Sequence, residues 1–262
     1  MKKIIVFILV FCAYFKSDAQ ILKQSIPDKL VVLTFDDAPV THYTYVAPLL
    51  KQYGFGGTFF VCEFPPNFYD STKYMTWNQI QQLGKMGFEV ANHTHTHASV
   101  TGMSQQQFTD QLKYIEDKCD SLKIGKPVTF AYPGYDVDSN ALATLNKSGY
   151  IFARAGGSRA YNPLSDNPYL VPSWAVTANN QEQIMNAIQQ AKHGKIVVLT
   201  FHGIPDYEHS WVTTPPELFK KYLQYLYNNH YKVIALKDLN NYINVKNAQK
   251  EIKPDFKKTL KN

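Results

Sequence analysis

The chain has 262 residues, of which 45% are hydrophobic and 14% aromatic, enough for one large domain with a sizeable core. After residues 1–19, 24 basic residues stand against 20 acidic ones, and six of these lysines follow residue 245, so the body of the chain is nearly neutral. Its only arginines are Arg154 and Arg159. This balance argues against a nucleic-acid partner, which would need clustered Lys and Arg.

The first residues of the chain are typical of an export signal. A short basic start precedes the apolar run 4–15, and Ser17-Asp18-Ala19 places small residues where a signal peptidase cleaves. This run is short for a membrane span. We therefore expect residues 1–19 to be a signal peptide cleaved before Gln20, and the mature protein to be exported without stable membrane insertion. An uncleaved anchor is the alternative.

Short apolar runs predict eight strands, several of them uninterrupted, as in strands buried on both faces. They cover Leu30–Phe35, Thr58–Cys62, Phe88–Ala91, Val128–Ala131, Ile151–Ala153, Trp174–Val176, Ile196–Phe201 and Lys232–Ile234. Amphipathic patterns, most of them preceded by Ser, Thr or Asn, predict six helices between these strands. They cover Val46–Tyr53, Trp77–Met86, Gln105–Leu122, Asn140–Lys147, Gln181–Lys192 and Glu217–Asn228.

The chain ends in a basic segment, 246–262, that contains Pro254. We expect this segment to be a loosely ordered tail after a single domain over residues 20–245. Within that domain Cys62 and Cys119 could form a disulfide outside the cytoplasm, but two cysteines give no framework pattern. We expect two buried free thiols.

The alternation of strands and helices predicts an α/β protein whose parallel sheet closes into a barrel, with an open doubly wound sheet as the alternative. In either fold, ligands bind at the carboxyl ends of the strands. Four polar segments follow predicted strands, and we expect them to meet at one mouth. They are Asp36-Asp37, His93–His97, Tyr132-Pro133-Gly134 and His202.

The acidic pair Asp36-Asp37 precedes Ala38-Pro39, which bends the chain. Neighbouring side chains on a straight strand point to opposite faces, but this bend lets both carboxylates border one centre. If one carboxylate binds a metal ion, the field of the cation keeps the other ionised near neutral pH, ready to take a proton from water. Two aspartates that cap a turn are the alternative.

Three histidines lie within five residues, at positions 93, 95 and 97. On a helical turn His93 and His97 share one face and could bind one metal ion. On an extended segment all three share a face, so spacing alone does not exclude His95. The cluster predicts a metal site, and a metal-scavenging surface is the alternative.

A further histidine, His202, directly follows the buried strand Ile196–Phe201. At the mouth shared with the two clusters above, its imidazole could protonate a leaving amine. Taken alone, a histidine in such a place is more often a hydrogen-bonded core residue. Combined with the acidic pair and the histidine cluster, it predicts a metal-assisted hydrolase.

These motifs resemble, in order and spacing, those of the polysaccharide deacetylase (NodB-homology) family, a carbohydrate esterase type, over about residues 30–239. The matching segments read Thr34-Phe35-Asp36-Asp37, His93-Thr94-x-x-His97 and Leu199-Thr200-Phe201-His202. The resemblance implies a distorted (β/α) barrel of about seven strand–helix units. It also implies one divalent metal ion, zinc first, with roles that fall on Asp36 as base, Asp37, His93 and His97 as metal ligands, and His202 as general acid.

Members of this family remove acetyl groups from N-acetylated sugars in peptidoglycan, chitin-like chains or exopolysaccharides, and some cleave O-acetyl esters or other C–N bonds. A divalent ion supplies an acidified water and polarises the acetyl carbonyl. The resemblance implies that the backbone amide of Gly134, in the segment that contains Tyr132, stabilises the tetrahedral oxyanion.

The chain departs from the family pattern beside the base. Ala131 stands where many members have an arginine that orients the base. We expect Arg154, at the end of the next strand, to take that role, and a surface arginine is the alternative. Ala38 replaces a common glycine, from which we expect little effect.

A second departure concerns His202. The aspartate that would tune this histidine is absent from the segment Pro172-Ser173-Trp174, and its replacement could be Asp206 or Glu208. Trp211, shortly after His202, could line an apolar pocket for the acetyl methyl group, or it could belong to a loop that caps the barrel.

Three functions are consistent with these features. The first is an exported hydrolase of carbon–nitrogen bonds that removes N-acetyl groups from an amino-sugar polysaccharide of the peptidoglycan or exopolysaccharide class. The second is an O-acetyl esterase or an amidase that acts on a small cyclic amide. The third is an inactive glycan-binding protein that keeps the metal for structure. The expected partner is an acetylated glycan substrate, and no nucleic-acid partner is expected.

Overall fold

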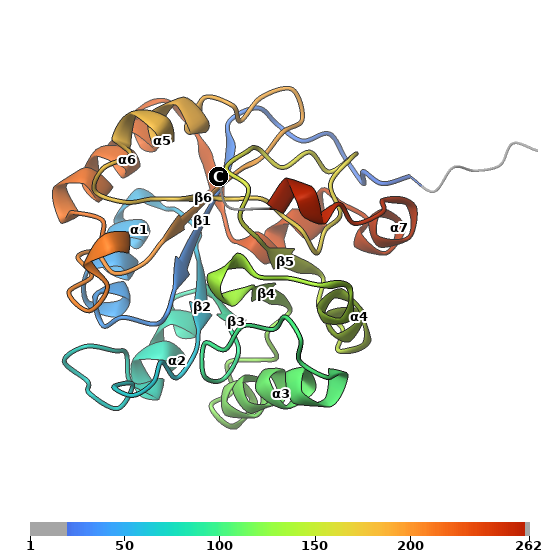
Figure 1. The fold of residues 1–262 in the computed structure, drawn as a ribbon. Coiled ribbons are helices and arrows are strands. Elements are labelled where there is room, and N and C mark those ends of the chain that lie inside the picture. The colour runs from blue at the N-terminus through green and yellow to red at the C-terminus, as the bar shows by residue number, and fades with distance from the viewer. Residues whose placement is uncertain (1–19, 260–262) are drawn as a thin grey trace, which may run out of the picture.

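The computed structural model describes residues 20–259, and in this part of the chain eight parallel strands form one curled sheet (Figure 1). The order is β5-β4-β3-β2-β1-β7-β6, and β8 pairs with β1. The strands are β1 (Leu30–Asp36), β2 (Thr58–Val61), β3 (Glu89–Asn92), β4 (Thr129–Ala131), β5 (Phe152–Arg154), β6 (Trp174–Ala175), β7 (Val197–Phe201) and β8 (Lys232–Ile234).

Helices surround this sheet on its outer side (Figure 1). They are α1 (Ala47–Tyr53), α2 (Trp77–Lys85), α3 (Gln105–Ser121), α4 (Ser139–Lys147), α5 (Gln181–Ile188), α6 (Pro216–Asn228) and α7 (Val245–Glu251). Helices α2 and α3 begin with capping boxes, because Thr76 and Ser104 each exchange hydrogen bonds with the residue three positions later. The predicted distorted barrel is confirmed, and each predicted strand boundary lies within one residue of the observed one.

The central strand β1 is buried along its whole length. Its first half pairs with β8, its second half pairs with β2, and β7 lies along its other side. Parallel strands place all their carboxyl ends at one edge of the sheet, so Asp36 reaches the same edge as the ends of β2, β4 and β7. This topology brings motifs that are far apart in the sequence to one mouth.

The predicted loose tail is wrong over its first part. Residues 245–251 form helix α7, which packs beside β5 and α4 (Figure 1). Val245, Ala248 and Ile252 are at most 8% exposed, and the Asn167 side chain donates a hydrogen bond to the Ile252 carbonyl at 2.7 Å. These apolar residues recur at helical spacing, which buries one face while the lysines between them stay on the other.

The predicted signal peptide, residues 1–19, lies outside the described residues. Among residues 20–259, no helix is long and apolar enough to cross a membrane. Cys62 and Cys119 are both buried and free, as expected. Burial raises the pKa of the Cys119 thiol to about 12, so this thiol stays protonated and unreactive at neutral pH.

Candidate metal centre

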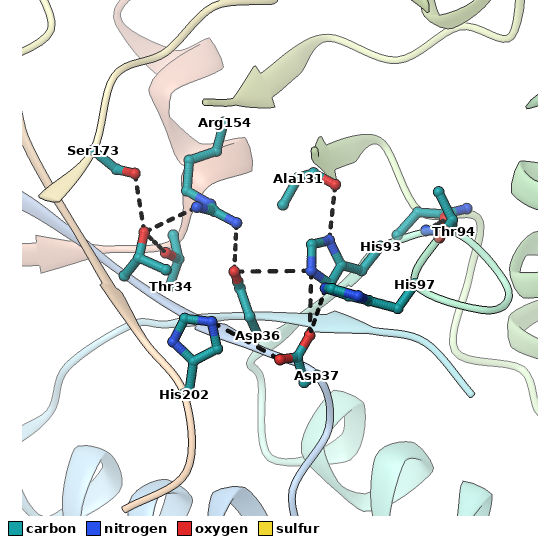
Figure 2. A network of polar contacts seen from close by, with 12 residues as sticks. Thr34, Asp36, Asp37, His93, Thr94, His97, Ala131, Arg154, Ser173 and His202 are labelled. Carbon is teal, nitrogen blue, oxygen red and sulfur yellow. Dashed lines mark hydrogen bonds and ion pairs between the residues drawn. The ribbon is translucent and has the colours of Figure 1, made fainter. Parts of the chain in front are cut away.

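The acidic pair converges because the chain turns directly after β1. Asp37 and Ala38 both adopt the left-handed region, with φ of +72° and +58°. This turn takes Asp37 off the strand geometry that would send it away from Asp36, and Figure 2 shows both carboxylates at one centre. Left-handed φ costs an alanine about 1–2 kcal/mol. An alanine in place of the common glycine at position 38 therefore destabilises this turn, contrary to the small effect expected from the sequence.

The histidine cluster forms a tight loop, which is neither the helical turn nor the extended segment that its spacing allows. Thr94 and His97 have positive φ, +64° and +53°. Gln111 on α3 accepts hydrogen bonds from the backbone amides of His95 and Thr96 at 2.9 and 3.1 Å. A side chain from a distant helix therefore shapes the loop, and the spacing of the histidines carries no sign of it.

Asp37, His93 and His97 come together at the mouth of the barrel. One ligand atom from each lies within 4.8 Å of the other two. The Asp37 Oδ1 atom is 3.3 Å from Nε2 of both histidines. This oxygen is buried and has no hydrogen-bond partner among the described residues. One carboxylate oxygen and two imidazole nitrogens are ligands that zinc ions commonly bind, and a buried oxygen without a hydrogen-bond partner is consistent with such a role.

The protonation of the two histidines also fits a metal ion. His93 Nδ1 lies 2.8 Å from the Ala131 carbonyl, which can only accept a hydrogen bond, so in the neutral ring Nε2 presents its lone pair to Asp37. Burial opposes protonation of this ring, but the charges of Asp36 and Asp37 raise the pKa of His93, so a proton or a metal ion is favoured beside these carboxylates. Burial lowers the pKa of His97 to about 4, which leaves its ring neutral at pH 7. Burial alone would raise the pKa of Asp37, but the neighbouring imidazoles of His93, His97 and His202 favour its ionised form and hold the pKa below its usual range. Three lone-pair donors thus face one another, and a cation between them would relieve their repulsion.

Arg154 makes an ion pair with Asp36 beside this cluster (Figure 2). Its Nη2 lies 2.5 Å from Asp36 Oδ2, and the arginine is completely buried, so the alternative of a surface arginine is wrong. The second guanidinium nitrogen donates to Thr200 at 3.1 Å, and Thr200 donates to Ser173 at 3.0 Å. Because β5 lies next to β4, the guanidinium of Arg154 reaches Asp36 from the strand beside Ala131.

The carboxylates of the centre outnumber its guanidinium groups. Two buried carboxylates, Asp36 and Asp37, face one guanidinium, that of Arg154. A buried charge is costly unless it is paired, and a divalent ion would compensate the excess negative charge. The Asp36 Oδ1 atom is buried and has no hydrogen-bond partner among residues 20–259, so this oxygen can accept a proton.

His202 borders the centre on the side of Asp37, whose Oδ2 lies 3.8 Å from His202 Nε2 (Figure 2). Neither expected partner reaches it. Asp206 instead accepts three backbone amides of its own loop, and Glu208 pairs with Lys73. His42 belongs to none of the sequence motifs, yet it is buried, and its Nε2 lies 3.0 Å from the His202 carbonyl and thereby holds the backbone of His202.

His95 points away from the centre, toward the buried carboxylate of Glu63, at 3.3 Å. The side chains of Tyr69, Trp77 and Tyr114 also donate to Glu63, at 3.1, 2.8 and 2.9 Å. These hydrogen bonds lower the pKa of Glu63 against the opposing effect of burial. We call these five residues the Glu63 cluster. Because His95 belongs to this cluster, only His93 and His97 of the three histidines are placed to bind a metal ion at the centre.

Other predicted residues take different places. Tyr132 is buried, and its hydroxyl donates to the Tyr169 carbonyl at 3.0 Å, so its side chain is not a substrate contact. Gly134 is exposed after β4, with a φ of +64°. Trp211 is 71% exposed and does not line a closed pocket for an acetyl group.

Comparison with known proteins gives related families and folds. The model of the family described as polysaccharide deacetylase matches residues 23–153. A peptidoglycan-N-acetylglucosamine deacetylase from Bacillus cereus is 28% identical over 128 residues, 47% of this chain and 54% of that protein.

Two solved structures share the fold. A chitin deacetylase from Colletotrichum lindemuthianum has a TM-score of 0.59 and 18% identity, covering 85% of this chain and 94% of that one. A CE4 family pseudoenzyme from Bacillus anthracis has a TM-score of 0.56 and 17% identity, covering 82% and 66%.

The chain spans between 25% and 54% of the length of the first three curated relatives it matches. The family model, in contrast, covers half of the chain and includes both the acidic pair and the histidine loop. The chain belongs to the polysaccharide deacetylase family.

Proposed function

We propose that this protein is a metal-dependent hydrolase that removes N-acetyl groups from an amino-sugar polysaccharide. The observation that carries the proposal is the donor set of Asp37, His93 and His97, whose ligand atoms lie within 4.8 Å of one another. Asp36 borders this set on one side and His202 on the other. A metal ion held there, zinc by the chemistry of the donors, would acidify water and polarise the acetyl carbonyl.

The residues of the chain supply the proton transfers. Asp36 takes a proton from the attacking water through its free Oδ1, while Arg154 fixes the carboxylate through Oδ2. The Gly134 backbone amide is the candidate donor to the oxyanion. When the C–N bond breaks, the amine leaves with its electron pair and takes a proton from His202. The products are acetate and a free amino sugar.

The substrate class is supported by the names of relatives. The peptidoglycan deacetylase and the chitin deacetylase both act, by name, on polymers of N-acetylated sugars. We therefore assign an acetylated glycan as substrate, either peptidoglycan or an exopolysaccharide. We also retain the proposal that residues 1–19 export a domain that begins at Gln20. N-terminal sequencing of protein secreted by expressing cells should start at that residue.

Acetate release from a panel of substrates tests this function. We expect release from N-acetylglucosamine oligomers or peptidoglycan, loss of release with a chelator, and recovery with added zinc. Release from acetylated xylan or hydrolysis of a cyclic imide, without release from the amino sugars, would instead establish the esterase or amidase alternative.

An inactive glycan-binding protein is the second candidate, because a pseudoenzyme shares the fold. The absence of an arginine at position 131 and of the usual aspartate near Trp174 favours this alternative, and the buried Arg154 beside Asp36 weakens the first of these two grounds. Glycan binding without acetate release from any substrate would establish this alternative.

The metal site can be tested apart from activity. Replacing Asp37 by Ala removes one of three ligands, and we expect zinc affinity to fall more than about a hundredfold, beyond the effect of losing an outer-shell partner. His95→Gln is the matched control, since His95 belongs to the Glu63 cluster and should leave zinc affinity within about threefold of wild type. Competition with a zinc-sensitive dye measures both. Equal affinity in the wild type and in Asp37→Ala would contradict the assigned ligands.

The general acid can be tested with two leaving groups. We expect His202→Ala to lower the rate of amide hydrolysis by about 10²–10⁴, because an amine leaves only after it gains a proton. The same variant should hydrolyse p-nitrophenyl acetate at a rate much closer to wild type, since p-nitrophenolate leaves without protonation. Initial rates on both substrates measure the difference. An equal loss on both would assign His202 another role.

A further inference from the structure

Aromatic rings form a continuous strip from the candidate metal centre to the surface. The Phe64 ring lies 4.7 Å from the ring of His97 and 4.8 Å from that of His209. His209 in turn lies 5.4 Å from Trp211. Phe64 and His209 are partly buried, and Trp211 is 71% exposed, so the strip starts at a metal-ligand candidate and ends in solvent. We call these four residues the aromatic strip.

Two loops at the mouth of the barrel carry this strip, residues 62–76 after β2 and 203–215 after β7. They are joined by the ion pair of Lys73 and Glu208 at 2.8 Å. The Phe64 ring is stacked on Tyr74 at 5.9 Å, with 8° between the ring planes. Asp206 fixes the second loop by accepting three of its backbone amides. The strip is therefore held in place before any ligand binds.

Exposed aromatic residues gather on the same two loops. Among residues 20–259, five large hydrophobic side chains are exposed, and three of them belong to these loops: Tyr69 at 82%, Tyr207 at 84% and Trp211 at 71%. A cavity of about 270 Å³ also lies between the loops, and Tyr74, Pro205 and Tyr207 contribute to its walls. Exposed aromatic side chains that gather around a mouth indicate a binding surface.

The chemistry of this surface suits a sugar ring. A pyranose presents a face of C–H groups with small positive partial charges, while its hydroxyls point outward to water. The face of an indole ring is negative and apolar, so the two faces are complementary. A small amide that fills only the metal centre would not reach Trp211, which lies three ring-to-ring steps from it.

We propose that the aromatic strip binds a sugar residue next to the one that is deacetylated, with Trp211 stacked on its face. The substrate is then an oligomeric glycan, and not a monosaccharide or a small cyclic amide. This inference rests on the proposed function for its substrate class. It assigns Trp211 to an outer subsite, in place of the acetyl pocket considered from the sequence.

The dependence of kcat/KM on chain length tests this subsite. With zinc-loaded enzyme, we expect kcat/KM to rise about tenfold or more from the N-acetylglucosamine monomer to the tetramer, as for one added stacking contact. Trp211→Ala should lower kcat/KM on the tetramer about tenfold, mainly through KM, and on the monomer distinctly less. Trp211→Phe, which keeps an aromatic face, should recover most of the loss.

Tyr227→Ala is the matched control. Tyr227 is also an exposed aromatic residue, at 55%, but it lies near the end of α6, at the opposite edge of the sheet. We expect wild-type kcat/KM at every chain length. The same loss on monomer and tetramer in Trp211→Ala would place this residue at the acetyl group and overturn the proposed subsite.

Tryptophan fluorescence provides a measurement that does not need turnover. Of the three tryptophans, Trp77 is partly buried and Trp174 is 3% exposed, so Trp211 is the solvent-exposed reporter. Titration with the deacetylated product, the glucosamine tetramer, should change the emission of the wild type and not that of Trp211→Ala. No change in the wild type would overturn the subsite even if acetate is released. A change without acetate release from any substrate would keep the subsite and reject the proposed hydrolase.

Discussion

Replacement of Asp36 by Asn should lower kcat by about 10²–10⁴, the range expected for the loss of a general base, while zinc remains bound. Asp36, the proposed base, is not one of the three residues whose ligand atoms lie together, which are Asp37, His93 and His97. An amide at position 36 keeps the shape of the carboxylate but cannot take a proton from water. Acetate release from the tetramer and zinc content by atomic absorption should be measured on the same sample.

Asp28→Asn is the matched control for this variant. Asp28 is exposed and accepts a hydrogen bond from the His193 amide at 2.8 Å, outside the candidate centre. We expect its activity to equal that of wild type. Turnover by Asp36→Asn at more than about a tenth of the wild-type rate would exclude Asp36 as the base, since even modest general bases contribute more than this.

Replacement of Arg154 by Met should destabilise the protein by about 3–5 kcal/mol, the usual cost of removing one partner of a buried ion pair. Arg154 is completely buried, and its guanidinium contacts both Asp36 and Thr200. Methionine replaces the aliphatic part of the arginine side chain but leaves the Asp36 carboxylate buried without its cation. Urea unfolding of the metal-free proteins measures this loss without the contribution of bound zinc.

The double variant Arg154→Met with Asp36→Asn separates the ion pair from simple packing. Removing both charges leaves no unpaired carboxylate, so the double variant should be more stable than Arg154→Met alone. Arg159→Met is the matched single control. Arg159 pairs with Asp166 at 2.6 Å, but its side chain is 30% exposed, so a smaller loss is expected. If the two Arg154 variants were equally unstable, packing and not charge would explain the loss.

The fold could be predicted from the sequence because its signals are local. Runs such as 196–199 are continuously apolar, and they give parallel strands that are buried on both faces. The parallel arrangement then places the carboxyl end of every strand at one edge. The proximity of the acidic pair to the histidine loop could therefore be predicted without knowing any side-chain contact. Arg154 could be proposed for the same reason, since adjacent strands bring their ends together.

Contacts that join distant parts of the chain could not be predicted. The shape of the histidine loop depends on Gln111, and the direction of His95 depends on Glu63 in another loop. The prediction that Asp206 or Glu208 contacts His202 is wrong, because proximity in sequence does not determine the direction of a side chain. The Asp206 carboxylate points to backbone amides of its own loop instead. Helix α7 was missed because its lysines dominate the composition, although three apolar residues at helical spacing mark its buried face.

A crystal structure of the zinc-loaded protein, with anomalous diffraction measured across the zinc edge, tests the central claim most directly. We expect one strong anomalous peak, about 2.0–2.1 Å from Nε2 of His93 and of His97 and within bonding distance of Asp37, with Asp36 and His202 unligated on either side. A peak on His95 and Glu63, or zinc that binds elsewhere while these three side chains stay empty, would contradict the account.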